Sequence, residues 1–243
     1  MARLRPFATL RLERAGPVAV ITLDRPRTLN AFDVAMRDDL HAALGAVDDD
    51  PTLRALLLRG RGRAFCTGGD VREFGSAPSP TVARSVRWER DVWGRLLGLR
   101  AATVAAVHGL AVGSGLEMAM LCDLCLAATG TRLALPECGL GMIPGVGGTQ
   151  TLPRRVGTGR ALDLTLTGRW LGVREAHRLG IVTTLVPRAQ LVPTARRLAA
   201  RLARLEPAVV QALRRCLRAA HDMSLERGVR LERVLGLGLQ DRR

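Results

Sequence analysis

Along the first half of the chain, the spacing of apolar residues changes several times between a strand pattern and a helix pattern. Residues 7–12 and 17–23 are short alternating or β-branched runs around Ala15-Gly16-Pro17, which predicts a β-hairpin. Residues 33–47 repeat apolar side chains at helical spacing, and 53–58 form a short apolar run typical of a buried strand. A strand, a helix and a strand in this order indicate crossover units, so we expect an α/β chain.

The spacing of apolar residues also predicts helices and strands in the rest of the chain. An amphipathic helix is expected at 81–99, and a third buried strand follows it at 103–107. The second half alternates short strands with helices before three helical patterns close the chain. The expected strands are 123–128, 132–135 and 182–186, and the expected helices are 162–166, 173–179, 190–205, 207–221 and 224–237.

Two acidic residues interrupt a stretch that is otherwise apolar or rich in glycine. Glu117 lies in HGLAVGSGLEMAMLCDLCLA, and Glu137 lies in LALPECGLGMIPGVGGTQ. A buried carboxylate is costly unless it is paired or used in chemistry. Two carboxylates that differ in burial can divide the roles of acid and base. Spacing alone leaves open that Glu117 is an ordinary helix residue and Glu137 an ordinary loop residue.

Glycines beside these acids predict close approach of the main chain to a ligand. Gly113-Ser114-Gly115 opens a helix, whose free N–H groups suit an oxyanion or a phosphate. Met118 stands where the dinucleotide fingerprint G-x-G-x-x-G needs its third glycine. Val112 likewise excludes the nucleophile motif G-x-S-x-G. Backbone N–H groups from this helix and from the loop at Gly68-Gly69 could therefore form an oxyanion hole.

Composition narrows the class of protein. Hydrophobic residues make up 47% and charged residues 24% of 243 residues, which is ordinary for a globular enzyme. The formal net charge is +15, and every basic residue is arginine, which excludes Schiff-base chemistry on lysine. This charge favours phosphate-bearing ligands, either coenzyme A or a nucleic acid. No apolar run is long enough for a membrane span and no secretion signal is evident, so we expect a cytoplasmic location.

Five cysteines without a secretion signal are expected to remain reduced. Cys122 and Cys125 form a C-x-x-C pair, but no second pair follows to complete a zinc site. We interpret them as core residues and predict no metal.

The motifs AFCTGGD, AAVHGLAVGSGLEMAMLCDL and LPECGLGMIPGVGGTQTLPRRVG resemble those of the crotonase superfamily, most closely the enoyl-CoA hydratases. The resemblance runs from about residue 7 to the C-terminus. It implies a spiral of repeated ββα units with a helical C-terminal region. The expected division is a core at 1–188 and a shortened region at 189–243 for contacts within a homotrimer or a dimer of trimers.

The resemblance also implies roles for individual residues. Substrates would be acyl-CoA thioesters of fatty acid metabolism, with no further cofactor. Glu117 and Glu137 match the acids that activate water, and Glu137 the proton donor to the α-carbon. Gly69 and Ser114 match the oxyanion-hole positions, where Ser114 replaces the usual Gly and Gly69 the usual Ala. Further expected substrate-binding residues are Arg25, Arg27, Thr67, Gly68, Asp70, Val71, Arg72 and Gly145.

Two other functions remain as alternatives to enoyl-CoA hydration. One is another crotonase-type reaction on acyl-CoA, such as double-bond isomerisation, although enzymes of that kind generally lack one of the two acids. The other is an RNA-binding protein on a hydratase scaffold, which the net charge of +15 suggests. We do not expect nucleic acid as a partner, because aromatic residues that stack on bases make up only 3% of the chain.

Overall fold

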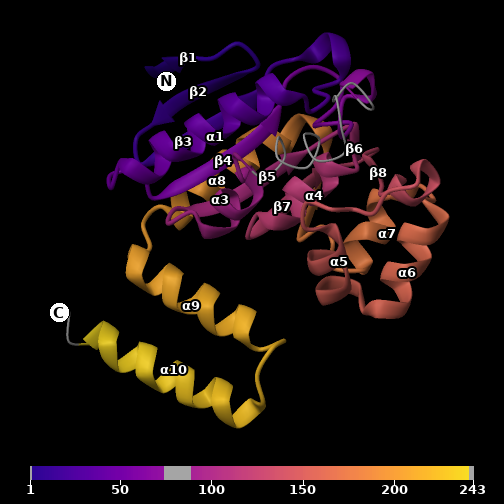
Figure 1. Ribbon diagram of the computed structural model, residues 1–243. Coiled ribbons are helices and arrows are strands. Elements are labelled where there is room, and N and C mark those ends of the chain that lie inside the picture. The colour runs from indigo at the N-terminus through magenta and orange to yellow at the C-terminus, as the bar shows by residue number, and fades with distance from the viewer. Residues whose placement is uncertain (1, 74–88, 241–243) are drawn as a thin grey trace.

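The computed structural model describes residues 2–73 and 89–240 (Figure 1). Its centre is a seven-stranded sheet in the order β1-β2-β3-β4-β5-β7-β10. The strands are β1 (Ala2–Pro6), β2 (Leu10–Ala15), β3 (Val18–Leu23), β4 (Ala55–Gly60), β5 (Ala102–Val107), β7 (Leu124–Ala128) and β10 (Thr184–Val186). The sheet is antiparallel from β1 to β3 and parallel from β3 onward. The predicted hairpin and the crossover connections are confirmed.

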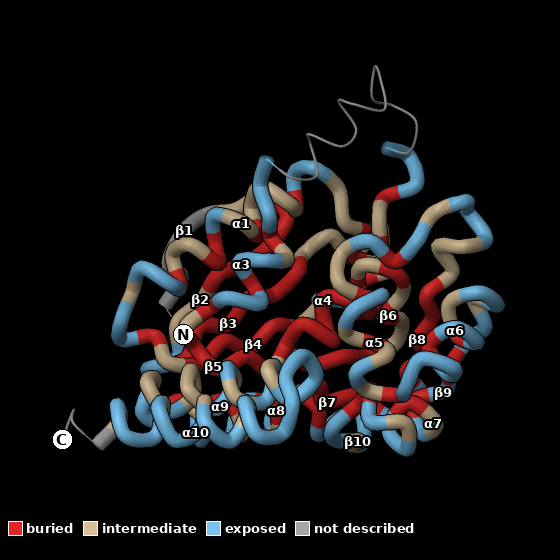
Figure 2. Tube along the Cα trace, turned by 60° about the horizontal axis from the view of Figure 1, so that its bottom comes forward, coloured by how far each residue is buried: buried red, intermediate tan, exposed pale blue. Residues whose placement is uncertain are grey.

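Helices cover both faces of this sheet (Figure 2). On one face, α1 (Val34–Asp49), α3 (Val92–Gly98) and α4 (Ser114–Leu121) enclose the larger apolar cluster. On the other face, α8 (Leu191–Leu202) places Leu191, Ala195 and Ala199 against the smaller cluster. Strand residues alternate between the two clusters, as in β4, where Leu56 and Leu57 belong to different ones.

A second, three-stranded sheet carries the loops around Glu137. It consists of β6 (Leu110–Val112), β8 (Arg132–Ala134) and β9 (Leu171–Gly172). Helices α5 (Gly148–Val156), α6 (Thr158–Thr167) and α7 (Val173–Arg178) lie beside it, at the right of Figure 1. Short 3-10 helices η1 (Pro26–Thr28), η2 (Val71–Glu73), η3 (Glu137–Leu140) and η4 (Arg188–Gln190) complete the elements.

The structure differs from the sequence prediction at two places. Within the described part of the helix predicted at 81–99, a turn at 89–90 precedes α3, which spans Val92–Gly98. The Asp91 side chain caps it by accepting a hydrogen bond from the Gly94 N–H at 2.8 Å, and residues 81–88 lie outside the described residues. Strand β1 was not expected; it pairs with β2 through an irregular register between Arg3 and Arg5.

The C-terminal region is helical, as predicted. After α8 come α9 (Pro207–Ala219), with Pro207 in its first turn, and α10 (Leu225–Gln240). Figure 1 shows α9 and α10 packed against each other and standing off from the sheet. Large apolar side chains remain exposed on both helices: Val209, Leu213, Leu217, Leu225, Val229, Val234 and Leu237. None of the helices in the described residues is long and apolar enough to span a membrane.

One arginine of α9 has a structural role. Arg214 pairs with Asp123, with Nε donating to Asp123 Oδ1 at 2.7 Å. Its guanidinium also donates to the carbonyl oxygens of Leu99 and Ala101, and its side chain is only 10% exposed. The arginine therefore joins α9 to the segment before β5 and to the loop after α4.

Replacing Arg214 by alanine should lower the free energy of unfolding by about 3 kcal/mol, because it leaves a partly buried carboxylate without its partner. Chemical denaturation measures the loss. Arg215→Ala is the matched control, since Arg215 is the exposed neighbour on the same helix, and its effect should stay within about 0.5 kcal/mol. Equal effects of the two substitutions would contradict this role for Arg214.

Candidate functional site

Glu117 is held in place by the loop that precedes α5. It lies in the first turn of α4, and its N–H donates to the Gly113 carbonyl at 2.9 Å. The residue is 1% exposed. Its Oε1 accepts hydrogen bonds from the N–H groups of Val146 at 3.0 Å and Gly148 at 2.7 Å. These two donors stabilise negative charge on a carboxylate that is otherwise surrounded by protein.

Glu137 lies against the beginning of α4, the helix that carries Glu117. It is the first residue of η3, shortly after β8. A Cβ atom on Gly113 would stand only 2.6 Å from Glu137 Oε1, so the carboxylate occupies the space that glycine leaves there. Glu137 Oε2 is buried and makes no hydrogen bond within the described part of the chain. Glu117 follows Gly113 by one helical turn, so both acids lie beside the first turn of α4.

Burial raises the pKa of Glu137. Desolvation disfavours the charged form of a carboxyl group, and no cation offsets it here among the causes of the shift. Glu137 therefore holds a proton at higher pH than an ordinary glutamate, which suits a group that delivers a proton.

The two backbone N–H groups expected at the oxyanion hole lie where two loops meet. The Phe32 N–H donates to Gly68 O at 2.7 Å and the Asp70 N–H to Phe32 O at 2.9 Å, so the intervening Gly69 N–H points away from Phe32. Ser114 is the first residue of α4, where a helix leaves its N–H without an intrahelical partner. A Cβ atom on Gly113 would lie 3.7 Å from Gly68 Cα, which brings the two loops into contact.

The glycines at this junction are required by close contacts. A Cβ atom on Gly115 would lie 2.3 Å from Cys66 O, and one on Gly68 would lie 2.9 Å from Val112 O. Gly68 and Gly113 also have φ angles of +90° and +51°, which side chains disfavour. Ser114 is accommodated, and its Oγ is buried without a hydrogen-bond partner in the described residues.

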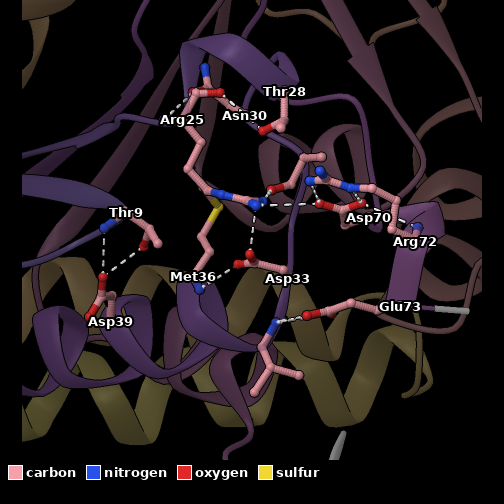
Figure 3. Close-up of polar contacts among 12 residues, drawn as sticks. Thr9, Arg25, Thr28, Asn30, Asp33, Met36, Asp39, Asp70, Arg72 and Glu73 are labelled. Carbon is pink, nitrogen blue, oxygen red and sulfur yellow. Dashed lines mark hydrogen bonds and ion pairs between the residues drawn. The ribbon is translucent and has the colours of Figure 1, made fainter. Parts of the chain in front are cut away.

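Arg25, one of the expected substrate-binding residues, makes contacts within the protein. Its Nη2 lies 2.7 Å from Asp33 Oδ2 and 3.3 Å from Asp70 Oδ2, and Nη1 donates to Ala31 O (Figure 3). Arg72 also pairs with Asp70, at 2.6 Å. The pKa of Asp70 is held well below its usual range by its hydrogen bonds to Arg72. These contacts join the two loops that were expected to border the substrate.

The remaining predicted substrate-binding positions lie on these loops or near Glu117. Arg27 is exposed and lines a cavity of ≈ 330 Å³ together with Asp24, Pro26 and Arg61. Thr67 donates its hydroxyl to Leu29 O at 3.4 Å, and Val71 is 66% exposed. Gly145 is exposed in the loop that leads to α5.

Asn30 is a site-shaping residue that the sequence reading did not single out. It is fully buried, with a φ of 59°. Its side-chain amide donates to Arg61 O at 2.9 Å and Ala64 O at 2.9 Å, and its Oδ1 accepts from the Arg25 N–H at 2.9 Å. An asparagine after Pro-Arg-Thr-Leu was a usable signal, because asparagine tolerates the left-handed conformation.

The cysteines near the site are buried thiols. Cys122 and Cys125 are both buried and free, and burial raises the pKa of Cys125 to about 12 and of Cys66 to about 11. Such thiols stay protonated at neutral pH and are inert as nucleophiles. The C-x-x-C pair packs in the apolar core, as expected.

The raised pKa of Glu137 predicts a pH-dependent stability effect. Its contribution to stability is fully present below the unfolded pKa of about 4.3 and is lost as pH rises through the higher folded pKa. Glu137→Gln removes this loss. The unfolding free energy of the variant, relative to wild type, should therefore increase between about pH 4 and pH 8. Denaturant titrations across this range measure the difference, and a constant difference would contradict it.

Comparison with known proteins identifies the family of this chain. A profile of the enoyl-CoA hydratase/isomerase family matches residues 13–240, and the chain belongs to this family. An (E)-benzylidenesuccinyl-CoA hydratase of Thauera aromatica is 35% identical over 95% of this chain and 90% of its own length.

Solved structures agree with the predicted α/β crotonase fold. An enoyl-CoA hydratase of Geobacillus kaustophilus superposes with a TM-score of 0.90 at 36% identity, covering 97% of this chain and 91% of that chain. A Thermobifida fusca protein solved in complex with CoA gives a TM-score of 0.88 at 30% identity, covering 97% and 94%. The chain is a crotonase-family protein of the kind that acts on acyl-CoA.

Proposed function

We propose that this protein is an enoyl-CoA hydratase, which adds water across the 2,3 double bond of an enoyl-CoA thioester. The observation that carries the proposal is the arrangement around Gly113. Glu137 lies against this glycine, Glu117 follows it by one helical turn, and the Ser114 N–H begins the helix directly after it. We infer that the two acids and the main-chain N–H groups of Gly69 and Ser114 face one substrate region at this junction.

In the proposed reaction the thioester carbonyl oxygen accepts hydrogen bonds from the N–H groups of Gly69 and Ser114. These donors stabilise the enolate oxygen that develops as water attacks C3, an effect worth about 10²–10³ in rate per donor. Glu117, with Oε1 fixed by Val146 and Gly148, takes a proton from the attacking water, whose hydroxyl bonds to C3. Glu137 delivers a proton to C2, completing the addition.

The test is turnover of crotonyl-CoA, followed as the loss of the enoyl absorbance, with the 3-hydroxyacyl product identified by mass. Hydration at a rate well above that without enzyme supports the proposal. Conversion of a 3-enoyl-CoA without hydration of crotonyl-CoA would replace it with double-bond isomerisation.

The C-terminal helices support a second, structural part of the proposal. The exposed apolar side chains of α9 and α10 form a surface of the kind that marks a protein–protein contact. We infer that they contribute to a homotrimer or a dimer of trimers. Light scattering after size-exclusion chromatography gives the mass directly, and a monomer at micromolar concentration would exclude this assembly.

A further inference from the structure

A second cavity, of ≈ 400 Å³, lies on the face of the main sheet that α8 covers. It opens where strands β3, β4 and β5 end and α8 begins. Crevices at the carboxyl ends of parallel strands are common ligand sites in α/β proteins. Four arginines line it: Arg11, Arg59, Arg61 and Arg188.

The sheet register forms the floor of this cavity. Arg11 is opposite Thr22, Thr22 is opposite Arg59, and Arg59 is opposite Ala106, so these side chains form one row across four strands. Arg59 therefore lies between two small side chains, Thr22 and Ala106. Their size leaves the space into which its guanidinium extends, and Arg59 Nε donates to Thr22 Oγ1 at 2.9 Å.

Two of the four arginines form no ion pair with a carboxylate of residues 2–73 or 89–240. Arg11 and Arg61 both pair with Asp24, at 2.6 Å and 2.9 Å. Of the ion pairs in the described part of the chain, none involves Arg59 or Arg188. Arg188 donates a long hydrogen bond of 3.4 Å to Gly62 O. Glu13 is the carboxylate residue that lines the cavity, so positive charge is in excess.

The charged groups around Arg59 are mostly cations. Burial lowers the pKa of Arg59, the nearby cation Arg196 lowers it further, and the carboxylate of Glu13 raises it. Burial and the cation of Arg188 lower the pKa of His108 to about 4, so this histidine adds no charge at neutral pH. Helix α8, of 12 residues, begins at the cavity with Leu191 and directs the positive end of its dipole there.

We propose that this cavity binds a phosphate group through Arg59 and Arg188. Guanidinium groups form paired, charge-assisted hydrogen bonds with phosphate oxygens, and a phosphate would supply the missing negative charge. The group comes either from a free small phosphate or from the nucleotide end of coenzyme A, because Arg61 lines both this cavity and the one beside Arg27.

Calorimetric titration with pyrophosphate at low salt tests the site. Arg59→Gln and Arg188→Gln should each weaken binding about tenfold or more, since each removes hydrogen bonds to a charged ligand. Arg160→Gln, on the exposed surface of α6, removes the same charge away from the cavity and should leave the affinity within about twofold of wild type. Thermal melts confirm that the variants are folded. Equal affinities for all four proteins would overturn the proposal.

Titration with coenzyme A then distinguishes the two sources of phosphate. Unchanged affinity for coenzyme A in Arg59→Gln and Arg188→Gln, with pyrophosphate binding alongside it, supports a separate site for a free phosphate. Parallel losses for both ligands, with mutual competition, support a site for the phosphates of the coenzyme. Because affinity is read directly, neither result depends on whether the protein hydrates enoyl-CoA.

Discussion

Glu137→Gln is expected to reduce kcat for crotonyl-CoA hydration by about 10²–10⁴, the usual contribution of general acid–base catalysis, while the affinity for CoA stays close to wild type. The substitution keeps the shape of the side chain against Gly113 but removes the proton that Glu137 is proposed to give to C2. A loss in kcat without a loss in binding is the signature of an interaction made only in the transition state.

Two further measurements distinguish a loss of catalysis from a loss of structure. The variant should be folded and should show the pH-dependent gain in relative stability described above, which separates loss of catalysis from loss of structure. Glu137→Asp keeps a carboxyl group on a side chain that is shorter by one methylene. This variant should retain more activity than Glu137→Gln. Turnover of Glu137→Gln at the wild-type rate would remove Glu137 from the mechanism.

Gly148→Ala is expected to lower kcat by about 10², because it displaces Glu117 without changing a catalytic group. A Cβ atom at position 148 would lie 2.7 Å from Glu117 Oε1 and 2.7 Å from Pro144 Cβ. The carboxylate must move or the loop must open. The N–H groups of Val146 and Gly148 then no longer converge on the same oxygen.

The control is Gly159→Ala, on the exposed surface of α6, where an added Cβ would meet nothing within 4 Å. It should preserve kcat within about twofold, since surface substitutions of this kind have small effects. Steady-state kinetics of the two variants, with crystal structures to locate Glu117, tests the argument. If both variants retain full activity, the position of Glu117 is not critical for turnover.

Local signals predicted much of the fold. The helical period of 33–47 predicted α1, whose N-terminus Asp33 caps by accepting from the Met36 N–H at 2.8 Å. The helical pattern of 207–221 likewise predicted α9, which has Pro207 in its first turn. In each case the determinant lies within a few residues of the element, so a single sequence contains it.

Long-range pairing was not predictable in this way. Arg25 and Asp70 are 45 residues apart in the chain, and Arg214 and Asp123 are 91 apart. Nothing near Arg25 distinguishes an arginine that binds phosphate from one that joins two loops; only the folded chain brings Asp33 and Asp70 to it. The same holds for the candidate site, where Glu117 and Glu137 were identified by sequence, but the contact of Glu137 with Gly113 required coordinates.

The manner in which α9 is attached has a consequence for motion. None of its residues is fully buried, and side chains such as Arg214 and Gln211 hold it by hydrogen bonds to carbonyl oxygens of the core. In a dissociated protomer, detaching the helix therefore exposes little apolar surface, so the opening free energy should depend only weakly on denaturant concentration. In native-state hydrogen exchange, the amides of α9 and α10 should exchange together, through a local opening well below the cost of disrupting the sheet.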